Sequence, residues 1–150
     1  MKRRGKTSLK SKETSVNRVI IAKVEPNEDI FDAIKEVIKK HEVKSGLINI
    51  IGALKKITIG FFNIDKKEYN FKTFDEDVEL ISCMGNISYK DNEPIIHLHV
   101  SIGMEDYTII GGHLTQPSIV SVTAEIYIYE INDIINRVND PRFDLSLLDL

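Results

Sequence analysis

Hydrophobic and polar positions alternate along most of this chain, and one stretch follows a helical period instead. Strict alternation is typical of strands that bury one face, whereas apolar residues three and four positions apart line one side of a helix. The helical stripe comprises Ile30, Ile34, Val37, Ile38 and His41. Asn27 is the predicted N-cap of this helix, and Glu28 and Asp29 suit the positive end of its dipole.

The remaining apolar runs predict seven or eight short strands. Seven of them cover residues 17–25, 47–51, 57–61, 69–74, 78–87, 95–103 and 118–130. The spacers between them are too short for repeated crossover helices, so the sheet is expected to be mainly antiparallel. The predicted fold class is therefore α+β, with a sheet of seven to eight strands packed beside one main helix.

Several strands carry more detailed expectations. In 17–25, Val19 and Ile21 are expected to face the core, with Ala22 as a further candidate. The nearly continuous apolar run 47–51 predicts a strand that is covered on both faces. Gly52-Ala53 is expected to form a bulge or a tight bend after that run.

The two longest predicted strands each have an apolar and a more polar face. On 95–103 the polar face holds His97, His99 and Ser101. On 118–130 the predicted apolar face comprises Val120, Val122, Ala124, Ile126 and Ile128, and the other face comprises Ser121, Thr123, Glu125, Tyr127 and Tyr129. The apolar segment 132–150 is expected to pack on the body or on another subunit. Within it, Arg137 near Asp140 is expected to form a structural ion pair rather than an anion site.

Charge is divided unevenly along the chain. Residues 1–13 carry six basic residues and one acidic residue, whereas the rest carries 14 basic and 22 acidic residues. Residues 1–15 have no hydrophobic period and are predicted to be a basic mobile tail, and residues 16–150 form a single domain. An acidic body with a basic tip is not typical of a domain that grips nucleic acid over a wide face.

The cysteine count and the length of the apolar runs indicate in which cellular compartment the protein is expected. The single cysteine, Cys83, rules out an intrachain disulfide and fits a reducing cytoplasm, where it is expected to be a buried small hydrophobe. The longest apolar runs are far short of the roughly 20 residues that cross a bilayer, so no membrane partner is expected.

Three of the four histidines lie within one stretch of the chain. Because residues i and i+2 of a strand point to the same face, His97 and His99 are expected to stand side by side. A hairpin through Glu105-Asp106 would bring His113 back towards them. Neutral imidazole is the commonest zinc ligand, so these three residues are a candidate metal site, with zinc as the expected cofactor.

Three nitrogen ligands leave one zinc position open, which is the arrangement of catalytic rather than structural sites. Glu125 is the candidate general base if the chain is an enzyme; otherwise it makes a hydrogen bond or an ion pair at an interface. By themselves, His97 and His99 are more simply interpreted as two histidines on a half-exposed strand, and it is the addition of His113 after Gly111-Gly112 that favours a metal site. Gly111 and Gly112 are expected to serve tight backbone geometry or close subunit approach.

Several short motifs occur in an order that resembles one known family. They are Val24-Glu25-Pro26-Asn27-Glu28-Asp29-Ile30, Gly52-Ala53-Leu54, His97-Leu98-His99-Val100-Ser101, Gly111-Gly112-His113-Leu114 and Thr123-Ala124-Glu125. Over about residues 17–140 the chain resembles the plants-and-prokaryotes conserved domain (PPC domain), of the stand-alone prokaryotic type. Plant AT-hook nuclear-localised proteins contain a related domain.

The resemblance implies a compact α+β subunit, a homotrimer, and a metal site at His97, His99 and His113. Where the family has Pro-Gly-Glu-Asp, this chain has Asn27, which tolerates positive φ best after glycine. The family is often described as DNA-binding, and here DNA could be reached through the basic N-terminal tail. The AT-hook is absent from this chain.

Three functions remain open from the sequence. The first is a homotrimeric binding protein that holds zinc or a small ligand and acts in regulation, with DNA as a possible partner. The second is a zinc-dependent hydrolase or lyase that uses Glu125 as a base. The third is a structural assembly unit whose histidines bind nothing.

Overall fold

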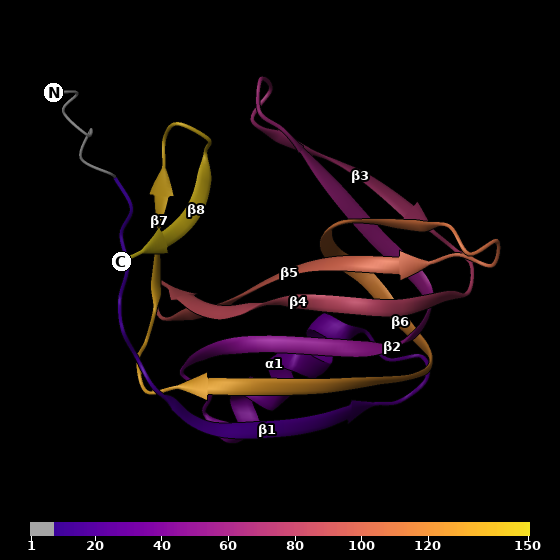
Figure 1. The fold of residues 1–150 in the computed structure, drawn as a ribbon, viewed down its shortest axis with the longest axis horizontal. Helices are drawn as coiled ribbons and strands as arrows, with labels where there is room; N and C mark the ends of the chain where they lie inside the picture. Colours follow the sequence, from indigo (N-terminus) through magenta and orange to yellow (C-terminus); the bar gives the residue numbers. More distant parts are fainter. Residues whose placement is uncertain (1–7) are drawn as a thin grey trace, which may run out of the picture.

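A computed structural model describes residues 8–150, and within this range the chain forms eight strands and one helix (Figure 1). The elements are β1 (Val16–Val24), α1 (Ile30–His41), β2 (Ser45–Asn63), β3 (Glu68–Phe74), β4 (Val78–Lys90), β5 (Glu93–Gly103), β6 (Ile109–Ile131), β7 (Asn136–Asp140) and β8 (Leu145–Asp149). The predicted α+β class, with a mainly antiparallel sheet beside one helix, is confirmed.

All strands belong to one sheet, in the order β3-β2-β6-β5-β4-β7-β8. β1 pairs with β6 beside this path, and β2 also pairs with β4. The predicted strands 47–51 and 57–61 are parts of the single strand β2. The bulge expected at Gly52-Ala53 lies instead in the neighbouring strand: between Ile50 and Gly52 the register shifts because Ile81 and Ser82 of β4 stand opposite Ile51 alone. A bulge lets one long strand bend and pair with different neighbours along its length.

The helix packs on one face of the sheet through Ile30, Phe31, Ile34 and Ile38. Its N-cap is Asp29, whose side chain accepts a hydrogen bond from the Phe31 backbone N–H at 2.8 Å, so the prediction of Asn27 was wrong. Asn27 lies in the preceding turn with φ 73°, which agrees with the tolerance for positive φ expected of asparagine.

β1 faces the core through Ile20, Ala22 and Val24, so the prediction of Val19 and Ile21 was wrong and only Ala22 of the predicted set packs against the core. Ile20 and Val24 are buried, whereas Val19 and Ile21 are 48% and 66% exposed. Val19–Ala22 is an uninterrupted apolar run, so its pattern does not determine which alternate residues turn inward.

Val122 also lies on the exposed side, at 67% exposure, although it was predicted to share the face of Val120. Gly52 of β2 pairs with Ala124, and Leu54 pairs with Val120. Three residues of β6 therefore oppose one residue of β2, and this bulge turns Val122 away from the core.

The sheet face away from α1 carries a group of uncovered apolar side chains, which we call the exposed apolar face. It comprises Val19, Ile21, Leu47, Ile51, Met84 and Tyr127. Strand pairing places Ile21 beside Tyr127, Tyr127 beside Asn49, and Asn49 beside Met84. Residues that are directly paired lie on the same side of a sheet, so these side chains form one continuous surface.

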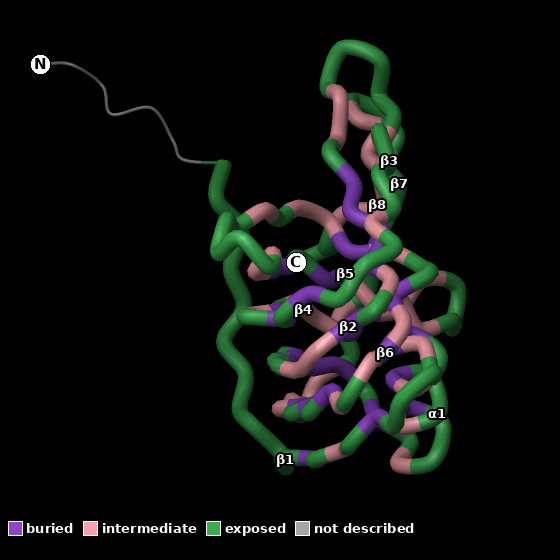
Figure 2. The backbone as a smooth tube through the Cα atoms, turned by 90° about the vertical axis from the view of Figure 1, so that its right-hand side faces the viewer, coloured by how far each residue is buried: buried purple, intermediate pink, exposed green. Residues whose placement is uncertain are grey.

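Two hairpins, β2–β3 and β7–β8, extend from the same end of the molecule (Figures 1 and 2). The Lys67 ammonium near one tip donates a hydrogen bond to the Pro141 carbonyl near the other, at 3.3 Å. The β7–β8 hairpin joins the sheet through a parallel pairing of Asn136 with Tyr89 on β4. The C-terminal segment thus packs on the body of its own chain.

The predicted ion pair between Arg137 and Asp140 is not formed. The Asp140 carboxylate binds Arg142 instead, at 2.6 Å. Adjacent strand residues point to opposite faces, so Arg137 and Asp140, three positions apart, leave the hairpin on different sides.

Residues 1–7 of the predicted basic tail lie outside the described part of the chain. Residues 8–15 form no helix or strand, but Lys12 and Thr14 donate hydrogen bonds to the Asp133 carboxylate at 2.8 and 2.6 Å. No helix within residues 8–150 has the length and apolar character needed to cross a membrane.

Candidate metal centre

The β5–β6 hairpin brings the three predicted histidines together. His99 on β5 is directly paired with His113 on β6, and His97 lies two residues before His99. The turn between the strands is held by the Asp106 carboxylate, which accepts hydrogen bonds from the backbone N–H and the hydroxyl of Thr108. The predicted return of the chain through Glu105-Asp106 therefore takes place.

The three imidazoles face one another closely. Their ring centroids are 5.0 Å apart for His97 and His99, 5.3 Å for His97 and His113, and 5.6 Å for His99 and His113. One nitrogen from each ring lies within 4.8 Å of the others. Ligand nitrogens around a tetrahedral zinc are about 3.3 Å apart, given Zn–N distances of about 2.0–2.1 Å, so modest side-chain rotation closes the set.

One ring nitrogen of the cluster has no partner. His113 Nδ1 is buried and makes no hydrogen bond within the described chain. A buried polar atom without a partner is costly, and a metal ion that accepts its lone pair would remove that cost. The donor set and this atom both fit a bound metal.

Two glycines place the strand that carries His113. A Cβ at Gly111 would lie 2.3 Å from the Val100 carbonyl oxygen, and a Cβ at Gly112 would lie 2.7 Å from the Gly60 carbonyl oxygen. Only glycine lets β6 lie this close to β5 on one side and to β2 on the other. The sequence predicted tight backbone geometry here, and the structure confirms it.

The environment favours the neutral form of His97 and His113, which is the form that binds metal. Burial, and after it the neighbouring Arg137, His113 and His99, together lower the pKa of His97 to about 4. Burial and the neighbouring His99 also lower the pKa of His113.

Two neighbours of the cluster could not be predicted from the sequence. The Tyr69 ring lies 4.6 Å from the His113 ring, and Phe71 stacks on Tyr69 at 5.4 Å. On the other side, Arg137 Nη2 lies 3.3 Å from His97 Nδ1. Tyr69 belongs to the β2–β3 hairpin and Arg137 to the β7–β8 hairpin. No local sequence pattern connects either residue with the histidines.

The other candidates lie elsewhere. Glu125 is exposed and is paired with Ile51 and Lys23 in the half of β6 that is remote from His113. Within a single chain, Glu125 therefore does not lie beside the histidines. Cys83 is fully buried, and burial raises the pKa of its thiol to about 12, which disfavours the thiolate that binds metal. Among residues 8–150, no cysteine or carboxylate joins the three-histidine group.

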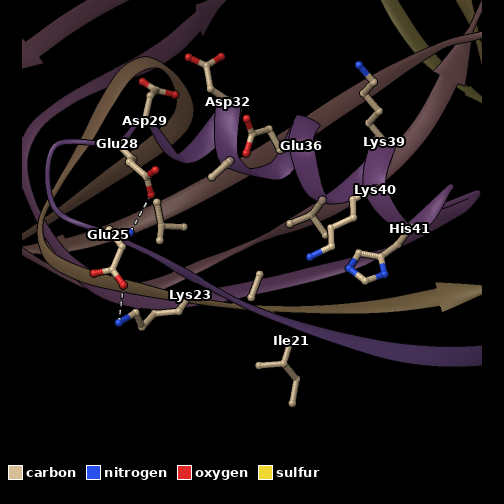
Figure 3. Close-up of a pocket in the computed structure, with 14 residues that line it drawn as sticks. Ile21, Lys23, Glu25, Glu28, Asp29, Asp32, Glu36, Lys39, Lys40 and His41 are labelled. Carbon is tan, nitrogen blue, oxygen red and sulfur yellow. Dashed lines mark hydrogen bonds and ion pairs between the residues drawn. The ribbon is translucent and has the colours of Figure 1, made fainter.

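A separate groove lies between β1 and α1 (Figure 3). One end is acidic, with Glu25, Glu28, Asp29, Asp32 and Glu36, and the other end carries Lys39, Lys40 and His41. His41 is the only histidine there and belongs to the last turn of the helix, where a cation is favoured. This groove has no part in the histidine centre.

The fold agrees with that of similar proteins of known structure. The sequence model of the Plants and Prokaryotes Conserved (PCC) domain matches residues 11–132. The chain belongs to this family. No curated protein matches it.

Three solved structures show how close the family fold is. A plant- and prokaryote-conserved protein from Pyrococcus horikoshii shares 35% identity and a TM-score of 0.85, over 95% of this chain and 98% of that one. A metal-containing protein from Archaeoglobus fulgidus shares 28% identity and a TM-score of 0.86, over 95% and 100%. A candidate DNA-binding protein from Bacteroides thetaiotaomicron shares 31% identity and a TM-score of 0.84, over 91% and 96%.

Proposed function

We propose that this member of the PCC family is a homotrimeric binding protein that holds zinc through His97, His99 and His113 and works in the cytoplasm. The observation that carries the proposal is the meeting of three imidazoles from one hairpin, with nitrogens within 4.8 Å of one another. The similarity to a protein described as metal-containing supports it. Zinc would supply a positive centre with one open position for a small ligand.

Metal analysis of the protein purified without a histidine tag tests this function. We expect about one zinc per chain after incubation near neutral pH, and loss of that zinc when His113 is replaced by alanine. His41→Ala is the matched control, because His41 lies at the end of α1, and it should retain the metal. A wild-type protein that takes up no zinc would contradict the proposal.

The exposed apolar face supports the trimer. Leu47 and Ile51 are 46% and 52% exposed in the single chain, although their run predicted a strand covered on both faces. Uncovered apolar patches on a soluble domain mark surfaces that bind other proteins. A second and a third copy would cover this face and complete the predicted burial.

A role in binding DNA is a second part of the proposal, and it belongs to the N-terminal tail. The rest of the chain is acidic, and the similar protein from Bacteroides thetaiotaomicron is described as a candidate DNA-binding protein. Deletion of residues 1–13 should abolish DNA affinity and leave the oligomer intact. Because such binding rests on phosphate contacts, it should fall steeply with added salt. Unchanged DNA binding after the deletion would rule out the tail.

The alternative, a zinc-dependent hydrolase or lyase, is favoured by one observation. The histidine group supplies three ligands with no fourth from the described residues, and an open zinc position can activate water. A general base from the same chain would have to be a group other than Glu125. A turnover screen that compares zinc-loaded with chelated protein separates the two functions, because an enzyme loses its activity on chelation.

A further inference from the structure

Arg137 is a buried cation without a counter-ion. It is 8% exposed and forms no ion pair with any carboxylate of residues 8–150, and residues 1–7 contain no acidic residue. Its guanidinium donates to Ser88 Oγ at 2.6 Å, the Ser146 carbonyl at 2.8 Å and Asn86 Oδ1 at 3.0 Å. These neutral groups hold the side chain in place but leave its charge uncompensated.

The guanidinium also keeps donors free for a ligand. Arginine has five N–H groups, and three of them are used by the serines and the asparagine. The fourth makes a long contact of 3.3 Å to His97 Nδ1. The fifth N–H has no partner among these groups. A metal that takes the His97 lone pair would also release the fourth N–H, so two donors of Arg137 would then be available beside the metal centre.

A second cation, Lys90 at the end of β4, contacts the same β7–β8 hairpin that carries Arg137. The Lys90 ammonium donates to Ser146 Oγ at 2.8 Å, and Lys90, like Arg137, forms no ion pair with a carboxylate in the described chain. Two cations therefore meet at one serine without an acid between them. On the opposite side of the histidines, Tyr69 and Phe71 offer stacked aromatic rings.

We propose that the histidine centre binds a small carboxylate with an apolar or aromatic body, with Arg137 as its charge partner, Lys90 as a second cation and Tyr69 against the apolar part. This inference rests on the proposed metal function. Arg137 is too buried to contact a nucleic-acid backbone, whereas a small anion is compact enough to approach it beside His97, which it touches and which is only partly buried. Arginine is suited to this role because its planar fork matches a carboxylate.

The test uses the full chain loaded with cobalt(II), a spectroscopic substitute for zinc. Cobalt content is measured first, and benzoate, acetate and phosphate are then titrated by visible absorption and calorimetry. We expect saturable binding of benzoate, weakened about tenfold or more in Arg137→Gln and less in Arg137→Lys, with cobalt content unchanged. A charge-assisted hydrogen bond of about 1.5–3 kcal/mol corresponds to a change of this size.

Matched variants separate binding from structure. Arg142→Gln removes an exposed arginine of the same hairpin and should bind benzoate as the wild type does. Tyr69→Leu should weaken benzoate about threefold and leave acetate unchanged. If Arg137→Gln fails to fold, as judged by circular dichroism, Lys90→Gln still tests the site and should weaken benzoate at least threefold.

The outcomes are distinct. A chain that takes up no metal overturns both the proposed function and this inference. A cobalt-loaded chain that binds none of the three anions overturns the inference but not the proposed function. The inference is also overturned if Arg137→Gln binds benzoate as tightly as the wild type, or if the metal-free protein binds benzoate as tightly as the cobalt-loaded protein. Phosphate binding that is tighter than benzoate binding overturns the assignment of a carboxylate.

Discussion

At the scale of single residues, Glu130 shows how one buried carboxylate joins several segments. It is 1% exposed, and its oxygens accept hydrogen bonds from Arg18 Nε at 2.6 Å, the Lys44 backbone N–H at 2.8 Å and Asn17 Nδ2 at 3.0 Å. Arg18 also donates to the carbonyl of His41 at the end of α1. The group therefore ties β1, the end of the helix and β6 together.

We predict that Glu130→Gln lowers the free energy of unfolding by about 1–3 kcal/mol, because charged hydrogen bonds are lost in a buried setting. Burial works to raise the pKa of Glu130, but the hydrogen bonds from Arg18, Lys44 and Asn17 outweigh it, and the pKa is lowered from 4.5. The unfolded chain therefore takes up the proton first as pH falls, and the contribution of Glu130 to stability disappears in acid. Urea unfolding at several pH values measures both effects.

Glu125→Gln is the control for this prediction, because Glu125 lies on the same strand but is exposed. It should change stability by less than about 0.5 kcal/mol. A loss in Glu130→Gln that is the same at pH 7 and in acid would show that the carboxylate charge is not the cause.

A second prediction at this scale concerns His97. Because burial, Arg137 and the other histidines hold its pKa near 4, its ring should stay neutral in the metal-free protein between pH 6.5 and about 4, where an unfolded chain is protonated. Acidification through this window should therefore favour the unfolded state. NMR titration of the ring measures the pKa directly. In Arg137→Gln the pKa of His97 should rise towards the ordinary value of 6.5 without reaching it, because burial remains. A His97 pKa at or above 6.5 in the wild-type protein would contradict the prediction.

At the scale of elements, β4 and β5 position the histidines through very close packing. Gly85 on β4 is paired with Leu98 on β5 and with Ile48 on β2. A Cβ at Gly85 would lie 1.8 Å from the His97 carbonyl oxygen. The contact is with backbone, so neither a rotamer change nor a small shift of one side chain could relieve it.

We predict that Gly85→Ala destabilises the fold by about 1–3 kcal/mol or more, since inserted atoms force the paired strands apart. It should also weaken zinc binding, because the displaced backbone carries His97. Gly103→Ala is the control, because its Cβ would meet side chains rather than backbone, the nearest being the flexible end of Ile81 at 3.1 Å. Thermal unfolding and zinc titration measure the two effects. Wild-type behaviour of Gly85→Ala would mean that the strands can separate at little cost.

At the scale of the whole molecule, the exposed apolar face and the histidine centre share one side of the sheet. Met84 at the edge of the face is paired with His99. Leu47 is paired with Asn86, which is in turn paired with His97. Assembly through this face would therefore bring a neighbouring copy close to the metal centre.

We predict that Ile51→Glu yields a monomer, because a charge in an apolar interface loses its water without gaining a partner. Light scattering should give three times 17.1 kDa for the wild type and 17.1 kDa for the variant. Ile64→Glu is the control, since Ile64 is also exposed, at 68%, but lies in the turn between β2 and β3. A wild-type mass of 17.1 kDa would contradict the trimer.

The sequence by itself determined the features that depend on local periodicity. The α+β class, the helix stripe, the polar face of His97 and His99, and the return of His113 through a hairpin follow from period-2 and period-3.6 patterns and from turn residues. The motifs also determined the family. Where local preference is ambiguous, as in the run Val19–Ala22 or in the choice between Asn27 and Asp29 as the cap, the pattern predicted the wrong residues.

Only the tertiary structure decided what lies around the histidines. Arg137 and Tyr69 come from two hairpins far apart in the sequence, and their place beside the cluster depends on strand order rather than on spacing. The bulge that turns Val122 outward, the separation of Glu125 from the histidines and the burial of Glu130 likewise arise from the pairing of distant strands. Such contacts leave no periodic trace in the chain, because each is set by the register of a long-range pair.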